Sequence, residues 1–177
     1  MAYAVKGSAH ATRLWQYKSA VAGPPAARLL RALLLVFLRD HGACVWHAAD
    51  MPGGPTHLAV VPTGRARPGS HPLLAMTAPY LHRPCAVLSA RSGIFPEREL
   101  DPCRFRARPI PGARVLLIDD TWTSGASAQS AALALRSAGA ARVATVVLGR
   151  HVAGADGEAA AFGPAVRPFQ LDRCAVH

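Results

Sequence analysis

The chain has 177 residues, with 20 lysines and arginines against 10 aspartates and glutamates, so its formal net charge is +10 at pH 7. This length predicts one domain with one substantial core. No apolar run approaches the roughly 20 residues that cross a membrane, and no secretory signal opens the chain, so no membrane partner is expected. The positive charge favours anionic partners such as phosphates, nucleotides or nucleic acid.

The four cysteines are widely spaced and include no C-x-x-C pair, and the eight histidines form no spaced metal-binding cluster. Zinc-ribbon and thioredoxin-like sites are therefore not predicted. Reduced thiols are typical of the cytosol, and we expect a cytoplasmic protein.

The first strong element is a helix that begins at Pro24 and Pro25. Proline is tolerated in a first helical turn, and the leucines and the phenylalanine that follow recur at helical spacing. The arginines between them lie mostly off this apolar stripe. We expect the helix to pack on the core and to end near Gly42.

Two short apolar runs and a second helix follow along the chain. Residues 57–62 and 85–89 predict buried strands, and residues 72–82 predict a helix between them. Residues 90–109 mix charges and prolines with little periodicity, which predicts a long loop or a pair of strands near the surface. Long loops in compact domains often carry function.

The second half of the chain predicts a parallel β-α-β unit. Residues 113–120 are apolar on successive positions up to an aspartate pair, as in a strand that is covered on both faces. A helix at residues 127–140 and a buried strand at residues 142–150 follow. We therefore predict an α/β fold with a mainly parallel sheet that is flanked by helices.

In this prediction residues 1–177 form a single domain. Its core spans roughly residues 14–150. We expect the C-terminal tail, residues 151–177, to form a small hood over the site together with part of the N-terminus.

The stretch VLLIDDTWTSGAS, from Val115 to Ser127, carries the predicted chemistry. It places Asp119 and Asp120 at the end of a strand, where open parallel sheets bind their ligands. The loop that follows has little bulk and opens a helix, whose first N–H groups lack internal partners and attract anions. This arrangement predicts a cradle for one phosphate. We expect the cradle to be built from Thr123, Ser124, Gly125, Ala126 and Ser127, with Thr121 as a further residue that binds the same ligand.

Carboxylates beside such a cradle accept hydrogen bonds from sugar hydroxyls or hold a hydrated Mg²⁺. The combination fits a ribose 5-phosphate, with Asp119 and Asp120 on the sugar and, through water or the ligand, on the metal. The alternative is an aspartate pair that only forms a turn and caps the helix after an ordinary strand.

The same stretch resembles the 5-phosphoribosyl-1-pyrophosphate (PRPP) signature of the type I phosphoribosyltransferases. In that signature an apolar run and two aspartates precede a T-T-G-x-T/S loop. Three further stretches are similar to the ComF-like branch of the family, namely QYKSAVAGPPAARLLRALL, VVPTGRARPGSH and PERELDPCRFRARPIPGARVLLIDD.

The resemblance implies a type I phosphoribosyltransferase fold and a Mg²⁺-dependent transfer of ribose 5-phosphate from PRPP to a nitrogenous base or related heterocycle, with release of pyrophosphate. Asp119 and Asp120 are expected to be catalytic. Arg91 and Arg98 are expected in the mobile catalytic loop of such enzymes, which closes over PRPP and excludes water.

A basic loop after the first predicted strand is a candidate pyrophosphate site. Thr63, Gly64 and Arg65 follow the strand end, and an arginine fork is suited to phosphate oxygens. A solvated surface loop is the alternative. Lys18, in the Y-K segment, either reaches a phosphate or pairs with a carboxylate.

Two other functions stay open. The chain could be a regulator that binds PRPP or a nucleotide without turnover, or a ComF-like competence protein that binds single-stranded DNA during DNA uptake, with which the positive charge is compatible. The family resemblance also implies a homodimer.

Overall fold

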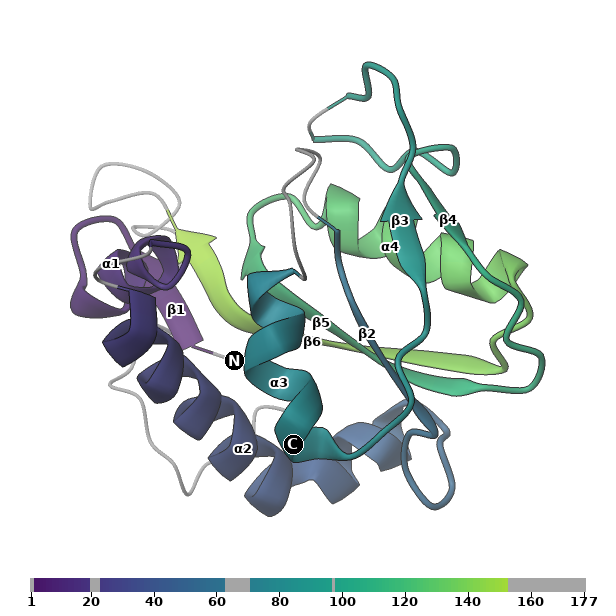
Figure 1. Cartoon of the computed structure of the whole chain (residues 1–177), viewed down its shortest axis with the longest axis horizontal. Coiled ribbons are helices and arrows are strands. Elements are labelled where there is room, and N and C mark those ends of the chain that lie inside the picture. The colour runs from purple at the N-terminus through teal and green to yellow at the C-terminus, as the bar shows by residue number, and fades with distance from the viewer. Residues whose placement is uncertain (1, 20–22, 63–70, 97, 153–177) are drawn as a thin grey trace.

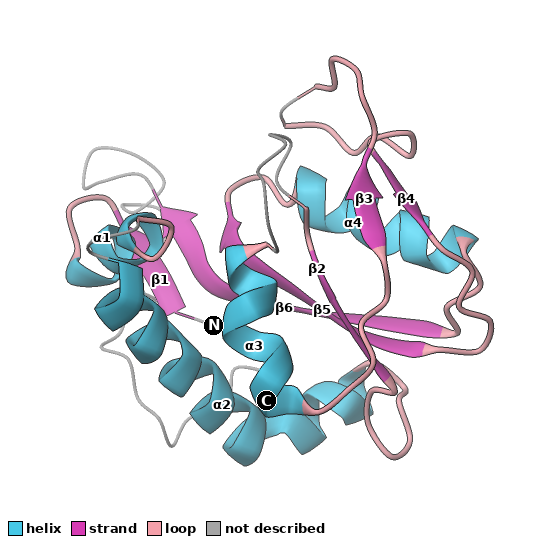
Figure 2. Ribbon diagram, viewed as in Figure 1, coloured by secondary structure: helices cyan, strands magenta, loops and turns pink. Residues whose placement is uncertain are grey.

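The computed structural model describes residues 2–19, 23–62, 71–96 and 98–152. They form an α/β fold in which helices cover both faces of a four-stranded parallel sheet (Figures 1 and 2). A separate pair of short antiparallel strands lies against one of the helices. The predicted α/β class and mainly parallel sheet are therefore confirmed.

The sheet has the strand order β1-β6-β5-β2, and every neighbouring pair is parallel. The central strands are β5 (Arg114–Trp122) and β6 (Arg142–Val152), and the edges are β1 (Ala2–Val5) and β2 (His57–Val60). Helix α4 (Ala126–Ser137) connects β5 to β6, which confirms the predicted β-α-β unit. Because the strands are parallel, their carboxyl ends share one edge of the sheet.

Three helices cover one face of this sheet. They are α1 (Ala9–Gln16), α2 (Gly23–Ala48) and α3 (Pro72–Leu81). Figure 1 shows α2 and α3 across this face and α1 near β1. Helix α3 agrees with the helix predicted over residues 72–82.

Alternate residues of β5 enter two different hydrophobic cores, since side chains alternate between the faces of a strand. Leu116 and Ile118 pack with the core under α1, α2 and α3, whereas Val115 and Leu117 pack with the core under α4. All four side chains are buried. Helix α4 meets the sheet mainly through small residues, which are Ala128, Ala131 and Ala134.

Helix α2 continues past Gly42 and ends at Ala48, so the predicted end was wrong. Gly42 is buried, and a Cβ at this position would lie 3.3 Å from Nε1 of Trp46, one turn further along. This glycine therefore makes room for an indole ring and does not stop the helix. The other end agrees with the prediction, because Pro24 and Pro25 lie in the first turn.

The short strands β3 (Leu88–Ala90) and β4 (Phe105–Ala107) form the antiparallel pair, which confirms one of the two alternatives for residues 90–109. The buried strand expected at residues 85–89 was wrong. Cys85 forms only an isolated bridge with β2, and from Val87 onward the backbone pairs with the β4 segment, as in the 3.0 Å hydrogen bond from the Arg108 N–H to the Val87 carbonyl.

The first residues add β1 and α1, which the sequence did not predict. β1 pairs with residues 149–152 of β6 and extends the sheet at its edge. Ser8 caps α1, since its hydroxyl oxygen accepts the Ala11 N–H at 3.2 Å. The N-terminus therefore belongs in part to the core.

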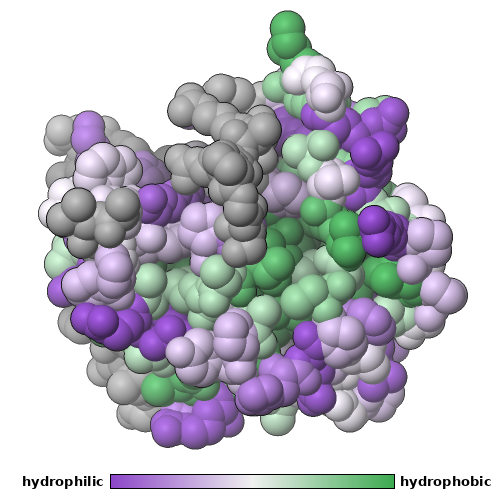
Figure 3. All heavy atoms as spheres, in the orientation of Figure 1, coloured by the Kyte–Doolittle hydropathy of each residue, from purple (hydrophilic) through white to green (hydrophobic). Residues whose placement is uncertain are grey.

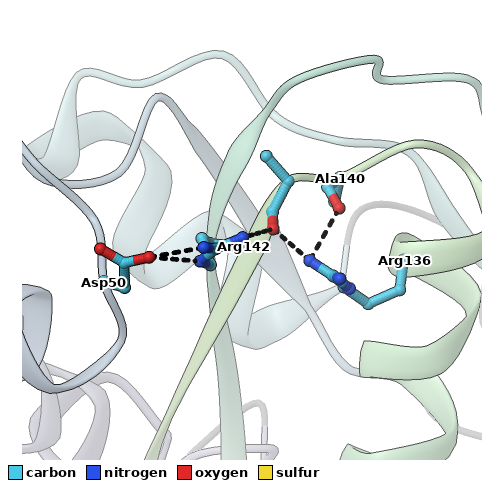
Figure 4. A network of polar contacts seen from close by, with 5 residues as sticks. Asp50, Arg136, Ala140 and Arg142 are labelled. Atoms are coloured by element: carbon cyan, nitrogen blue, oxygen red, sulfur yellow. Dashed lines mark hydrogen bonds and ion pairs between the residues drawn. The ribbon is translucent and has the colours of Figure 1, made fainter.

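A polar network ties the opposite, amino end of the sheet to the elements around it (Figure 4). Arg142, at the start of β6, donates to the Asp50 carboxylate from the turn after α2. Arg136, in the last turn of α4, donates to the carbonyls of Ala140 and Ala141. These contacts hold the β-α-β unit at the end of the sheet opposite the carboxyl edge.

The face that carries α3 is apolar at its middle and hydrophilic around its rim (Figure 3). Within the described residues, no helix combines the length and the hydropathy needed to cross a bilayer.

Candidate functional site

The candidate site lies at the carboxyl edge of the sheet, where β5 ends and the loop to α4 begins. Asp119 and Asp120 lie inside β5, because Thr121 and Trp122 still pair with β6. The two carboxyl groups lie close enough together for the charge of Asp120 to affect the titration of Asp119.

Asp119 is the more buried of the two acids, with 9% of its surface exposed. Its Oδ1 accepts the backbone N–H of Asp120 at 2.9 Å. Burial, followed by the negative charge of Asp120, raises the pKa of the Asp119 carboxyl to about 7. Asp119 therefore changes its charge near neutral pH.

Asp120 is held by two residues that follow α1. The Tyr17 hydroxyl donates to Oδ2 at 2.7 Å, and the Lys18 ammonium forms an ion pair with the same oxygen. Burial alone would raise the pKa of Asp120, but the hydrogen bond and charge of Lys18 and the Tyr17 hydroxyl outweigh it, so the pKa lies below its usual value. Asp120 is therefore ionised at neutral pH, and of its two predicted roles Lys18 takes the pairing with a carboxylate.

Gly125 shapes the loop between β5 and α4. It is the N-cap of α4 and has φ 82°, a left-handed conformation that favours glycine. A Cβ at Gly125 would lie 2.2 Å from Cζ2 of Trp122, so the indole ring lies directly over this residue. The backbone here is therefore both bent and closely covered.

The first turn of α4 keeps open hydrogen-bond donors. The Ser124 hydroxyl oxygen accepts the Ala126 N–H at 3.3 Å. Within the described part of the chain, the N–H groups of Ser127 and Ala128 have no acceptor. Such donors, at the positive end of a helix dipole, attract anions.

A cavity of about 500 Å³ opens at this helix start. Three arginines line it, Arg91, Arg98 and Arg104, and they face a hydroxyl-bearing wall. That wall consists of Thr123, Ser124 and Ser127, and the other lining residues are Pro62, Ala90, Gly93, Phe95 and Phe105. The structure thus brings the predicted phosphate loop together with both predicted loop arginines. We call this space the arginine cavity.

Other predicted site residues lie elsewhere. Asp119 and Asp120 do not line the arginine cavity, and Thr121 borders a second cavity of about 500 Å³ together with Trp15 and Lys18. Ala126 is buried as the first residue of α4. The predicted pyrophosphate residues Thr63, Gly64 and Arg65 lie outside the described residues, as does most of the predicted hood.

Arg104 and Tyr17 were missed as site residues. Tyr17 could have been found, because it precedes Lys18 in the Y-K segment that resembles the ComF-like proteins. Arg104 carries no such signal. It alternates with Arg106 and Arg108 at a spacing of two, which would put all three on one face of a strand, yet only Arg104 is buried.

The acids of this site could hold a metal ion only together with a ligand. In the chain as described, no group of three histidine, cysteine, aspartate or glutamate side chains could bind a metal ion. Mg²⁺ is commonly held by one or two carboxylates, with waters and substrate phosphates as its other ligands. Asp119 and Asp120 fit this shared mode, in which the ligand supplies several oxygens.

The chain matches no protein-family model and no curated protein sequence. A functional proposal for it therefore depends on the residues of the site.

Proposed function

We propose that this chain is a cytoplasmic, Mg²⁺-dependent phosphoribosyltransferase with a type I phosphoribosyltransferase fold. It would transfer ribose 5-phosphate from PRPP to a nitrogenous base or related heterocycle and release pyrophosphate. The observation that carries the proposal is the arginine cavity, in which a hydroxyl-bearing helix start faces three arginines. The resemblance of residues 115–127 to the PRPP signature supports it.

In this proposal the 5-phosphate lies on the loop and the first turn of α4. The hydroxyls of Thr123 and Ser127 and the open N–H groups of α4 donate to its oxygens. The sugar extends across the end of β5, where Asp120, ionised at neutral pH, and Asp119 accept hydrogen bonds from its hydroxyls.

The transfer replaces one bond at C1 of the ribose. A ring nitrogen of the acceptor forms the new bond to C1, the bond from C1 to the pyrophosphate oxygen breaks with its electron pair, and the acceptor releases a proton to solvent. Arg91 and Arg98 supply positive charge where the leaving pyrophosphate gains negative charge, which is an electrostatic contribution. Mg²⁺, when bound, neutralises pyrophosphate oxygens in the same way.

Calorimetric titration with PRPP and Mg²⁺, combined with a pyrophosphate-release assay over a panel of bases, tests the proposal. The double variant Asp119→Asn with Asp120→Asn should lose PRPP affinity while its circular dichroism stays that of a folded protein. The matched control is Asp40→Asn, which removes an exposed carboxylate on α2 and should bind PRPP like the parent.

Each possible result separates the proposal from its alternatives. Failure of the parent protein to bind PRPP in the presence of Mg²⁺ would refute the proposal. Binding without pyrophosphate release over the whole panel would favour a regulator, and salt-sensitive binding of single-stranded DNA without PRPP binding would favour a competence protein. Sedimentation analysis tests the homodimer that the family resemblance implies.

A further inference from the structure

We propose that Arg104 is a phosphate-binding residue, which holds a phosphate monoester in the arginine cavity together with Ser127 and the open N–H groups of α4. The inference deepens the proposed function, on which it rests for the identity of the sugar phosphate.

The Arg104 side chain is fixed in place between two segments. The residue precedes β4, which lies beside α4 (Figure 1), and is only 8% exposed. Its guanidinium donates to the Ser127 hydroxyl oxygen at 2.9 Å and to the carbonyl of Pro96. A guanidinium held in this way needs little further ordering when a ligand arrives.

The positive charge of Arg104 has no counter-charge in the part of the chain that the structure describes. No carboxylate lies within ion-pair distance of it there, and its buried Nε has no hydrogen-bond partner. The nearest acid along the chain, Asp101, instead accepts the Cys103 N–H at 2.7 Å. Buried charges are normally paired or bound to a ligand of opposite charge, because burial of an unpaired charge is strongly unfavourable.

The position of Arg104 makes a charge without a counter-charge among the described residues still less favourable. Ser127, which its guanidinium contacts, is the second residue of α4 and lies at the positive end of the helix dipole. A cation beside open N–H groups is repelled by them. A dianion between the guanidinium and the start of α4 would offset the repulsion and supply the missing counter-charge.

The size and lining of the arginine cavity fit a phosphate that is part of a larger molecule. A volume of about 500 Å³ is more than one phosphate fills, and Arg91 and Arg98, which are exposed residues, also line it. We therefore assign Arg104 to the phosphate nearest α4. The two exposed arginines are left for the rest of the ligand.

The test compares Arg104→Gln with Arg106→Gln, a matched control on β4 whose arginine is exposed and lies outside the cavity lining. The probes are inorganic phosphate and ribose 5-phosphate at constant ionic strength, measured by calorimetry and thermal unfolding. We expect Arg104→Gln to lower the affinity for both probes at least about tenfold, which is the usual scale for loss of a charge-assisted hydrogen bond. Arg106→Gln should bind like the parent.

A second readout separates ligand binding from a structural role. Without phosphate, Arg104→Gln should melt at or above the temperature of the parent, because it removes a buried charge that has no counter-charge among the described residues. With saturating phosphate the order should reverse, since only the parent gains the full stabilisation. Equal phosphate affinity in the two proteins, or a loss of melting temperature that is the same with and without phosphate, would overturn the inference.

Direct observation covers the case in which Arg104→Gln does not fold. In the parent protein, the Nε–H resonance of Arg104 should shift as inorganic phosphate is added, and an unchanged resonance at saturation would also overturn the inference. Failure of this inference and of the proposed function are distinguishable. Turnover of PRPP by Arg104→Gln with an unchanged KM refutes only the role of Arg104, whereas phosphate binding through Arg104 without any PRPP binding refutes only the transferase.

Discussion

Replacement of Gly125 by alanine tests whether the loop before α4 needs a glycine for its conformation, for its contact with Trp122, or for both. Gly125 has φ 82°, and a new Cβ would lie 2.2, 2.5 and 2.8 Å from three atoms of the Trp122 ring. A left-handed conformation costs a residue with a Cβ about 1–2 kcal/mol. Extra atoms in a well-packed site cost a further 1–3 kcal/mol or so.

Gly112→Ala is the matched control. Gly112 also has a positive φ, 71°, but a Cβ there would meet nothing within 4 Å. Gly112→Ala therefore has the same cost of a left-handed backbone conformation but no steric clash of the new Cβ. We therefore expect Gly125→Ala to lower the free energy of unfolding by about 1–3 kcal/mol more than Gly112→Ala does.

Urea unfolding, followed by circular dichroism, measures these differences. Trp122→Ala supplies the second side of a double-mutant cycle, because removal of the ring leaves room for the new methyl group. The double variant Gly125→Ala with Trp122→Ala should therefore be more stable than the sum of the single losses predicts. Equal losses at Gly125 and Gly112, together with strict additivity in the cycle, would refute the reasoning.

Two further predictions concern the carboxylates. The pKa of Asp119 is raised to about 7 in the folded chain, so the folded state binds the proton more tightly than the unfolded state does. The free energy of unfolding therefore falls as the pH rises from 4 to 8, by about 2–4 kcal/mol for this group. Asp119→Asn should remove that fall, as measured by urea unfolding across this pH range. Loss of the Lys18 charge should raise the pKa of Asp120, so a carboxyl NMR titration of Lys18→Met should show Asp120 protonating at higher pH than in the parent. The control Arg39→Met, which breaks an exposed ion pair elsewhere, should leave that titration unchanged.

The sequence predicted the elements whose signals are local. The unbroken apolar run Val115–Ile118 indicated a strand covered on both faces, and its residues do alternate between two cores. The loop after Trp122 indicated a helix start with open N–H groups, and α4 begins there. Local composition and spacing are sufficient for such features, because they depend on residues close together in the chain.

The remainder depends on contacts between distant segments. Gly42 was taken as a helix end because the sequence does not reveal that the Trp46 ring packs over it. The contact between Arg104 and Ser127 joins residues that are 23 positions apart in the sequence. The spacing of the arginines at 104, 106 and 108 predicts the same exposure for all three, so it does not single out Arg104.

The buried alanines of α4 link the geometry of the candidate site to the packing of the protein core. Ala128, Ala131 and Ala134 are buried in the core between α4 and the sheet, so the packing of this core sets how far the first turn of α4 stands from Arg104, which contacts Ser127. Two added methyl groups, as in Ala131→Val, would push α4 away from the sheet and widen that gap without altering any atom that a ligand touches. The affinity of the site for an anion therefore depends on buried methyl groups that the anion does not contact.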